Sequence, residues 1–228
     1  MEITHLTLLA QDLPALHHFY TDILGLPMLE GGEEVITFGV GRSKLTFLQA
    51  DEDWEGSYHF AFNIPENQFG QAKAWLSARI ELIHNPTGQD EFRFESWNAH
   101  ALYFFDPAGN ILELIARHDL PNASDTPFRG DSLLAISEIG LTTSDVAATV
   151  RQIQSYLPLK VYRNSESEEF VALGDAIGLL IIVKKGRIWW PETGIPASPS
   201  AVSILSMDSG GQGFQISGPP YDISPVLA

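Results

Sequence analysis

Residues 3–27 read ITHLTLLAQDLPALHHFYTDILGLP, and this stretch combines a strand with a helix. From Ile3 to Leu9, successive side chains point to opposite faces of a β-strand, so His5 and Thr7 share one face and Leu6 and Leu8 the other. Asp12 is a suitable helix N-cap, and the apolar residues after it repeat at helical spacing as far as Gly25, where a C-terminal glycine belongs. The stretch therefore predicts a strand followed by an amphipathic helix.

The same order returns twice along the chain. HFAFNI (59–64) precedes the helical pattern ENQFGQAKAWLSARI (66–80), and AISEIGL (135–141) precedes a third helical pattern that ends near residue 157. Strand-like segments follow each helix, which gives a βαβββ unit three times. VSILSM and GFQISGPP, near the C-terminus, indicate the remnant of a fourth unit without a helix. An internal repeat of this kind is a strong organisational signal.

These units predict an α+β fold. Paired βαβββ modules would form a curved-sheet cup, followed by an additional partial, degenerate module pair at the C-terminus. We expect residues 1–118 to form a two-module cup that holds the functional site. Residues 119–133 would be a linker, rich in Pro, Asp and Ser, and residues 134–228 a degenerate third module plus a fragment of a fourth.

Composition narrows the range of partners. The formal net charge is −16, from 29 acidic and 13 basic residues, which disfavours nucleic acid and anionic membranes. The chain has no cysteine, and no apolar run reaches the length of a membrane span. We therefore expect a soluble cytoplasmic protein whose partner is a small molecule. The apolar LLIIV strand and the Trp189–Trp190 pair suit dimerisation or covering of the cup, so a homodimer stays open.

A set of polar residues occupies equivalent positions in the first two units. His5 and His59 begin the first strands, and Glu113 lies on the closing strand of the second unit, where the first unit has Thr46. A lone strand histidine is more often a core or surface residue than a ligand. A carboxylate that faces a cup, however, needs a partner, because burying it unpaired costs several kcal/mol.

His5, His59 and Glu113 are therefore predicted to hold one divalent metal ion. Two imidazoles and one carboxylate suit Fe2+ or Mn2+ and can also bind Zn2+ or Ni2+. The third unit has Glu138 and Ile181 at the matching positions, and we do not expect this pair to form a comparable ligand set. Open coordination positions would let a substrate bind through adjacent oxygens.

Further side chains are candidates for the pocket around the metal. His100 could point inward and transfer a proton, although a surface position is an equally open interpretation. The candidate catalytic residues are His100 and Tyr103. The candidate substrate-binding residues are Thr7, Thr46, Asn63 and Trp97.

ITHLTLLAQDLPALHHFYTDILGL (3–26), HFAFNI (59–64) and YFFDPAGNILELI (103–115) resemble the vicinal oxygen chelate superfamily. This superfamily includes glyoxalases, bleomycin resistance proteins, fosfomycin-modifying thiol transferases and extradiol ring-cleaving dioxygenases. The resemblance covers residues 1–118 and implies paired βαβββ modules with a metal in the cup. It also implies His5, His59 and Glu113 as the ligands.

The expected function is that of a divalent-metal-dependent enzyme acting on a small molecule with vicinal oxygens. A lyase, an isomerase, a thiol transferase and a ring-cleaving dioxygenase all remain open, because a fold does not fix a reaction. The alternative is a non-catalytic protein that sequesters a small molecule, as bleomycin resistance proteins do.

Overall fold

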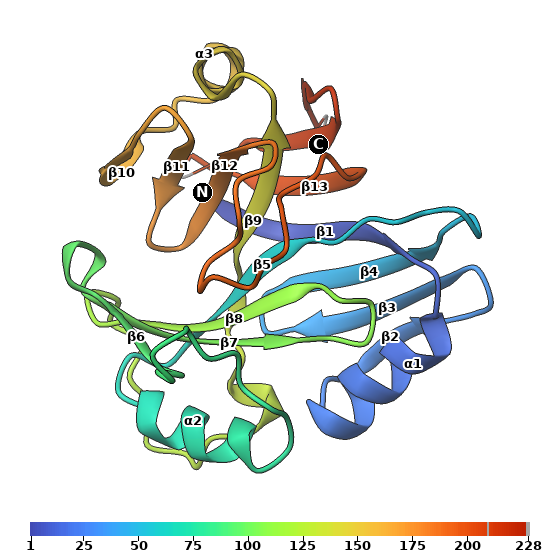
Figure 1. The fold of residues 1–228 in the computed structure, drawn as a ribbon, viewed down its shortest axis with the longest axis vertical. Coiled ribbons are helices and arrows are strands. Elements are labelled where there is room, and N and C mark those ends of the chain that lie inside the picture. The colour runs from blue at the N-terminus through green and yellow to red at the C-terminus, as the bar shows by residue number, and fades with distance from the viewer. Residues whose placement is uncertain (209, 227–228) are drawn as a thin grey trace.

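The computed structural model describes residues 1–208 and 210–226, and it has the expected α+β fold with two curved sheets (Figure 1). The helices are α1 (Leu13–His18), α2 (Phe69–Ser77) and α3 (Val146–Tyr156), and α1 continues into a π-helical turn over Phe19–Ile23. None of the helices in the described ranges is long and apolar enough to cross a membrane. The strands are β1 (Glu2–Ala10), β2 (Met28–Gly31), β3 (Val35–Val40), β4 (Ser43–Gln49), β5 (His59–Ile64), β6 (Phe92–Phe94), β7 (Ala99–Phe105), β8 (Ile111–Arg117), β9 (Ala135–Thr143), β10 (Val161–Glu166), β11 (Phe170–Asp175), β12 (Gly178–Lys184), β13 (Val202–Met207), β14 (Gly213–Gly218) and β15 (Asp222–Pro225).

Local sequence signals explain where the helices begin and end. Asp12 caps α1, because its carboxylate accepts a hydrogen bond of 2.9 Å from the backbone N–H of Ala15. Asp145 caps α3 in the same way, with a bond of 2.9 Å from the N–H of Ala148. Gly25 follows the first helical segment with a φ of +70°, a backbone conformation that glycine adopts without strain. The predicted cap and stop of the first helix are confirmed.

The order of strands shows how the units combine. Over the described residues, one sheet runs β15-β14-β13-β1-β4-β3-β2 and the other runs β10-β11-β12-β9-β5-β8-β7-β6. The second unit therefore shares a sheet with the third, through the antiparallel pair β5–β9, and the first unit pairs with the C-terminal remnant through β1–β13. This pairing corrects the expectation that residues 1–118 form one cup by themselves.

The correction has a physical reason. The first strand of every unit has one edge that is free to pair, and its backbone N–H and C=O groups are the same in every unit. Side-chain alternation predicts which face of a strand is buried, but it does not say which free edges meet. The segment 119–133, expected to be a linker, joins β8 to β9 and packs on α2, where the Trp75 and Phe128 rings lie 5.4 Å apart.

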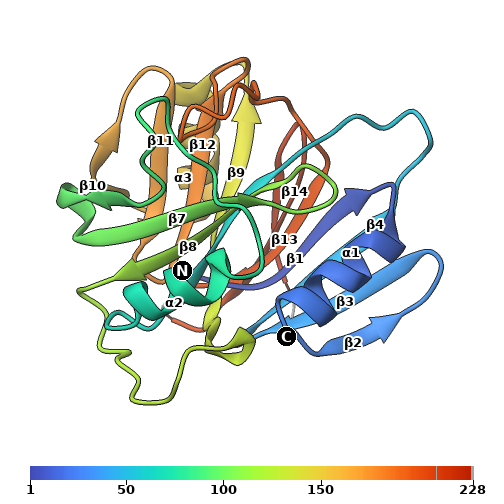
Figure 2. The same ribbon diagram turned by 60° about the horizontal axis from the view of Figure 1, so that its bottom comes forward.

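The larger of two hydrophobic clusters joins the two sheets and lies under the helices. Leu6 of β1, Phe60 of β5, Leu114 of β8 and Ile139 of β9 are all completely buried in it. Helix α1 lies against β3 and β4, α2 against β7 and β8, and α3 against β11 and β12 (Figure 2). The helix-covered face of each sheet is therefore packed. The opposite, inner face of the β5–β9 sheet carries Ala61 and Tyr103, which belong to the second cluster.

The DPAG turn between β7 and β8 ties the first two units together. The N–H of Gly109 donates to the carbonyl of Asp106 at 3.0 Å, as expected for a β-turn. The buried Asp106 carboxylate accepts bonds of 2.9 Å from the Tyr20 hydroxyl and 2.8 Å from the Asn110 side chain. It also accepts bonds of 3.0 Å from the N–H groups of Ala108 and Asn110. A carboxylate from the second unit thus anchors the first helical segment.

We expect Asp106→Ala to lower the free energy of unfolding by about 2–4 kcal/mol, because it leaves several buried donors without an acceptor. Tyr20→Phe removes only one hydroxyl and should cost about 1 kcal/mol. Urea unfolding followed by far-UV circular dichroism measures both values. Equal costs for the two variants would contradict the anchoring role of Asp106.

Candidate metal centre

A row of residues crosses the inner face of the β5–β9 sheet. Tyr103 of β7 lies opposite Glu113 of β8, Glu113 is the register partner of Ala61 on β5, and Ala61 is the partner of Glu138 on β9. Residues that are neighbours in such a row project from the same face. Because Ala61 carries only a methyl group, the carboxylates of Glu113 and Glu138 can converge above it.

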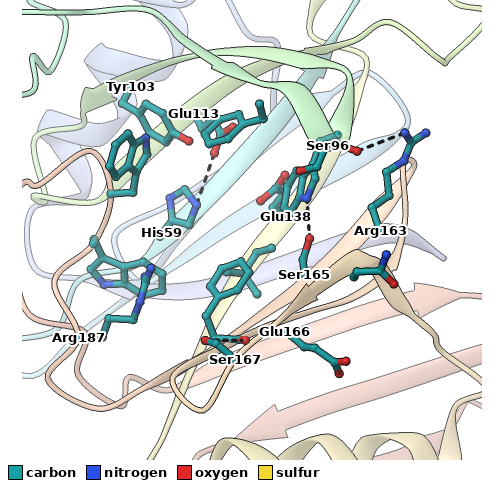
Figure 3. Close-up of a pocket in the computed structure, with 17 residues that line it drawn as sticks. His59, Ser96, Tyr103, Glu113, Glu138, Arg163, Ser165, Glu166, Ser167 and Arg187 are labelled. Atoms are coloured by element: carbon teal, nitrogen blue, oxygen red, sulfur yellow. Dashed lines mark hydrogen bonds and ion pairs between the residues drawn. The ribbon is translucent and has the colours of Figure 1, made fainter.

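His59 lies two residues before Ala61 on β5 and so faces the same side. Its Nδ1 is 3.1 Å from the carbonyl oxygen of Ile111, so the Nδ1–H donates to the backbone and Nε2 is left with its lone pair. Nε2 is 3.6 Å from Oε2 of Glu113 (Figure 3). Burial, together with the positive charge of Arg187, lowers the pKa of His59 to about 4, so the imidazole is neutral at pH 7.

His59, Glu113 and Glu138 each offer a ligand atom, and these atoms lie within 4.8 Å of one another. All three side chains are buried. Within residues 1–208 and 210–226, no second group of three His, Asp or Glu side chains meets at this spacing. A neutral imidazole and two carboxylates are suitable ligands for a divalent cation.

The charges at this centre do not balance. Arg117, which is 1% exposed, forms an ion pair with Glu138 and donates from Nε to Oδ1 of Asn63 at 3.2 Å. One guanidinium therefore accompanies two carboxylates. Burial raises the pKa of Glu113 well above its ordinary value, and the negative charge of Glu138 raises it further. Without a cation in the group, these two effects favour the protonated form of Glu113.

The structure brings His59 and Glu113 together as expected, but Glu138 rather than His5 completes the group. His5 lies on β1 in the other sheet, where its Nε2 is 2.7 Å from Oγ1 of Thr46. Thr7 and Thr46 belong to that sheet as well, so they are not part of the row that carries Glu113 and Glu138. The prediction placed the first two units in one cup, and the β5–β9 pairing replaces the first unit with the third.

The other candidates divide between the two faces of the sheet. His100 is on the helix-covered face, where its ring lies 5.1 Å from that of Phe69 in α2 and its Nδ1 is 2.7 Å from Nε2 of His118. It therefore does not point into the cup. Asn63 faces the same side of β5 as His59 and Ala61, and its Oδ1 accepts the hydrogen bond from Arg117. Tyr103 and Trp97 do line the cavity, and burial, followed by the charge of Glu113, raises the pKa of Tyr103 well above its usual range.

The centre opens into a cavity of about 710 Å³. Six aromatic side chains share its wall with polar and charged ones, and Figure 3 shows the side chains that surround it. Trp189, in the loop after β12, stands with its ring 5.2 Å from that of His59. It fits there because Gly140 has no side chain, since a Cβ at that position would lie 2.6 Å from the indole. The aromatic wall residues are Phe94, Trp97, Tyr103, Phe170, Trp189 and Trp190.

Sequence reasoning missed Glu138, although a signal for it exists. Glu138 is the one charged residue in the apolar run AISEIGL, and it ends up 2% exposed. A buried carboxylate on a strand requires a cationic partner, and this requirement also points to Arg117, the only basic residue within the strand β8. Ile181 discouraged the assignment, but the closing strand that matters is β8 of the second unit.

We expect Arg117→Met to destabilise the metal-free protein by about 3–5 kcal/mol, because it leaves Glu138 buried beside Glu113 without a counter-charge. Adding Glu138→Gln to this variant removes the unpaired charge and should restore part of the loss. Urea unfolding in the presence of a chelator measures both. A double variant no more stable than Arg117→Met would show that the ion pair does not determine the stability of this region.

Known proteins match either the first half of the chain or nearly all of it. The family model described as Glyoxalase/Bleomycin resistance protein/Dioxygenase superfamily matches residues 2–114. No curated protein matches the sequence. Among solved structures, a protein from Bacillus subtilis described as a "putative dioxygenase" has a TM-score of 0.63 at 13% identity, over 95% of this chain and 81% of its own. At this identity the likeness shows the fold alone, and it extends over both sheets.

Two shorter proteins match about half of the chain. Lactoylglutathione lyase from Agrobacterium tumefaciens is 26% identical, with a TM-score of 0.42 over 49% of this chain and 90% of its own. A mutant of the fosfomycin resistance protein FosX from Listeria monocytogenes, complexed with Mn(II) and a dihydroxypropylphosphonic acid, is 19% identical. Its TM-score is 0.40, over 51% of this chain and 89% of its own.

Proposed function

The chain belongs to the Glyoxalase/Bleomycin resistance protein/Dioxygenase superfamily, and from this premise we propose that it is a divalent-metal-dependent enzyme acting on a small molecule with vicinal oxygens. The observation that carries the proposal is the group of His59, Glu113 and Glu138, whose ligand atoms lie within 4.8 Å of one another. Two buried carboxylates with a single guanidinium partner need either a proton or a further cation, and the free Nε2 of His59 can take part in binding a cation.

The donor set fits a metal of intermediate to hard character. One imidazole and two carboxylates suit Mn2+ or Fe2+, and the same atoms can bind Zn2+ or Ni2+. Three protein ligands leave positions open for substrate oxygens. When bound, a divalent ion would supply a Lewis acid that polarises adjacent substrate oxygens.

The residues of the chain supply the rest of the environment. The carbonyl of Ile111 holds the His59 ring in one tautomer, and Arg117 orients the carboxylate of Glu138. Tyr103 keeps its proton, because its pKa is raised, and its hydroxyl can donate a hydrogen bond to a substrate oxygen. The indoles of Trp97 and Trp189 add apolar surface beside the centre, and apolar surroundings strengthen each of these interactions.

A second candidate function is non-catalytic sequestration of a small molecule. The aromatic wall favours it, because such a wall binds a planar ligand whether or not a reaction follows. The buried charges of the centre favour the enzyme, since a purely apolar cavity would bind the same ligands at lower cost. The reaction type, a cytoplasmic location and a homodimer stay predictions.

Metal content distinguishes the ligands proposed here from the set predicted by sequence. We expect the purified protein to bind about one divalent ion and His59→Ala or Glu138→Gln to weaken binding by at least about tenfold, because each removes a ligand. His5→Ala is the matched control and should bind as tightly as the unmodified protein. Elemental analysis after dialysis against a defined metal concentration gives the values.

Absence of bound metal in the unmodified protein would overturn the metal-dependent proposal and favour sequestration. Loss of metal in His5→Ala, with retention in Glu138→Gln, would instead return the site to the first sheet. If metal is bound, assays of thiol transfer, ring cleavage and hemithioacetal isomerisation with the loaded protein then identify the reaction class.

Metal affinity should also increase as the pH rises above the ordinary pKa of a glutamate. The raised pKa of Glu113 favours its protonated form in the metal-free protein, so the metal competes with a proton there, and this competition weakens as the pH rises. His59, with its pKa lowered to about 4, is already neutral in this range and contributes no proton. Calorimetry in two buffers of different ionisation enthalpy should detect proton release in the unmodified protein and less release in Glu113→Gln. An affinity independent of pH would contradict the assignment.

A further inference from the structure

We propose that Arg187 is a specificity-determining residue that binds an anionic group, a carboxylate above all, on a planar aromatic substrate. This inference rests on the proposed function, because it concerns the ligand of the same cavity. It adds a charge requirement to a site that the metal ligands alone would leave open to neutral molecules.

Three arginines lie in or under this cavity, and two of them are already paired. Arg117 forms its ion pair with Glu138. Arg163 forms an ion pair with Asp119 and donates from Nη1 to the carbonyl of Ser96 at 3.4 Å. In the part of the chain that the structure describes, the Arg187 side chain makes neither an ion pair nor a hydrogen bond, although it lines the cavity.

Backbone bonds hold Arg187 at this position. Its N–H donates to the carbonyl of Lys184 at 3.1 Å, and its carbonyl accepts from the N–H of Ala197 at 2.8 Å. The guanidinium carbon lies 5.3 Å from the centroid of the Phe170 ring, which packs against the side chain and orients it. Figure 3 draws Arg187 on the His59 side of the cavity and Arg163 at the other end.

An unpaired arginine in such acidic surroundings indicates a site for an anionic ligand. The chain has a net charge of −16, and Glu113, Glu138 and Glu166 also line the cavity. An anionic ligand is repelled by most of this surface, so Arg187 provides the one cationic contact in the cavity that is not already neutralised among the described residues. Its planar guanidinium can bind a carboxylate through two parallel hydrogen bonds.

The wall determines the shape of the ligand. The cavity of about 710 Å³ accommodates a single-ring molecule with room for substituents. Indole and phenyl groups on several sides favour a flat ring, which can stack on them or meet them edge to face. A ring carboxylate at Arg187 would leave the opposite edge of the ring to face the carboxylates of the proposed metal centre.

Two pairs of probes test this inference. Benzoate and benzyl alcohol differ in the carboxylate and do not require a metal, whereas 3,4-dihydroxybenzoate and catechol add vicinal oxygens. Quenching of tryptophan fluorescence reports binding, because Trp97, Trp189 and Trp190 line the cavity. With a chelator present, we expect benzoate to bind about tenfold more tightly than benzyl alcohol.

Arg187→Met should abolish this preference while leaving the affinity for benzyl alcohol unchanged, and Arg187→Lys should keep part of it. Arg151→Met is the matched control, because Arg151 is an exposed residue of α3 outside the cavity, and this variant should keep the full preference. Circular dichroism checks that each variant is folded. If Arg187→Met is not folded, Arg187→Gln replaces it, because this variant keeps a polar side chain and loses the charge, and unchanged selectivity in it would overturn the inference.

Retention of the benzoate preference in Arg187→Met would overturn the inference, as would failure of all four probes to bind. The proposed function is tested separately by the dihydroxy pair. If added metal does not tighten binding of catechol or 3,4-dihydroxybenzoate, the metal-dependent function fails. The affinity for benzoate relative to that for benzyl alcohol still decides the role of Arg187.

Discussion

The antiparallel pairing of β5 with β9 is the constraint on which the candidate site depends. It aligns Ala61 with Glu138, while the parallel pairing of β5 with β8 aligns Ala61 with Glu113. A slip of one residue in either register would turn a carboxylate toward the apolar core. The energetic cost of two buried negative charges is then reduced by Arg117 on one side, and by a proton or a cation on the other.

Much of the fold could be predicted from the sequence because its signals are local. The alternation in β1, the Asp12 cap and the turn at Asp106 each depend on residues only a few positions apart. Strand pairing is different, since it joins backbone edges that look alike in every unit. The sequence therefore predicted the repeated units and two of the three clustered residues, His59 and Glu113, but it assigned the wrong partner unit and with it His5.

The alternation of side chains along a strand already separates the two candidate catalytic residues. His100 and Tyr103 lie three residues apart on β7, so their side chains must point to opposite faces of the sheet. Tyr103 is the register partner of Glu113 and faces the cavity, whereas His100 contacts Phe69 of α2. The aromatic wall was harder to foresee, because Trp189 reaches His59 only through the space above Gly140, a contact between distant segments.

The loop between β12 and β13 has a consequence for how such a protein can diversify. Arg187, Trp189 and Trp190 all come from this connection, whereas the clustered imidazole and carboxylates stand on three adjacent strands of a sheet. Loops tolerate substitution and changes of length better than the central strands of a sheet do. Ligand preference can therefore drift in one short connection while the candidate metal centre stays fixed, so descendants of a single ancestor can acquire new ligands without rebuilding the strands beneath them.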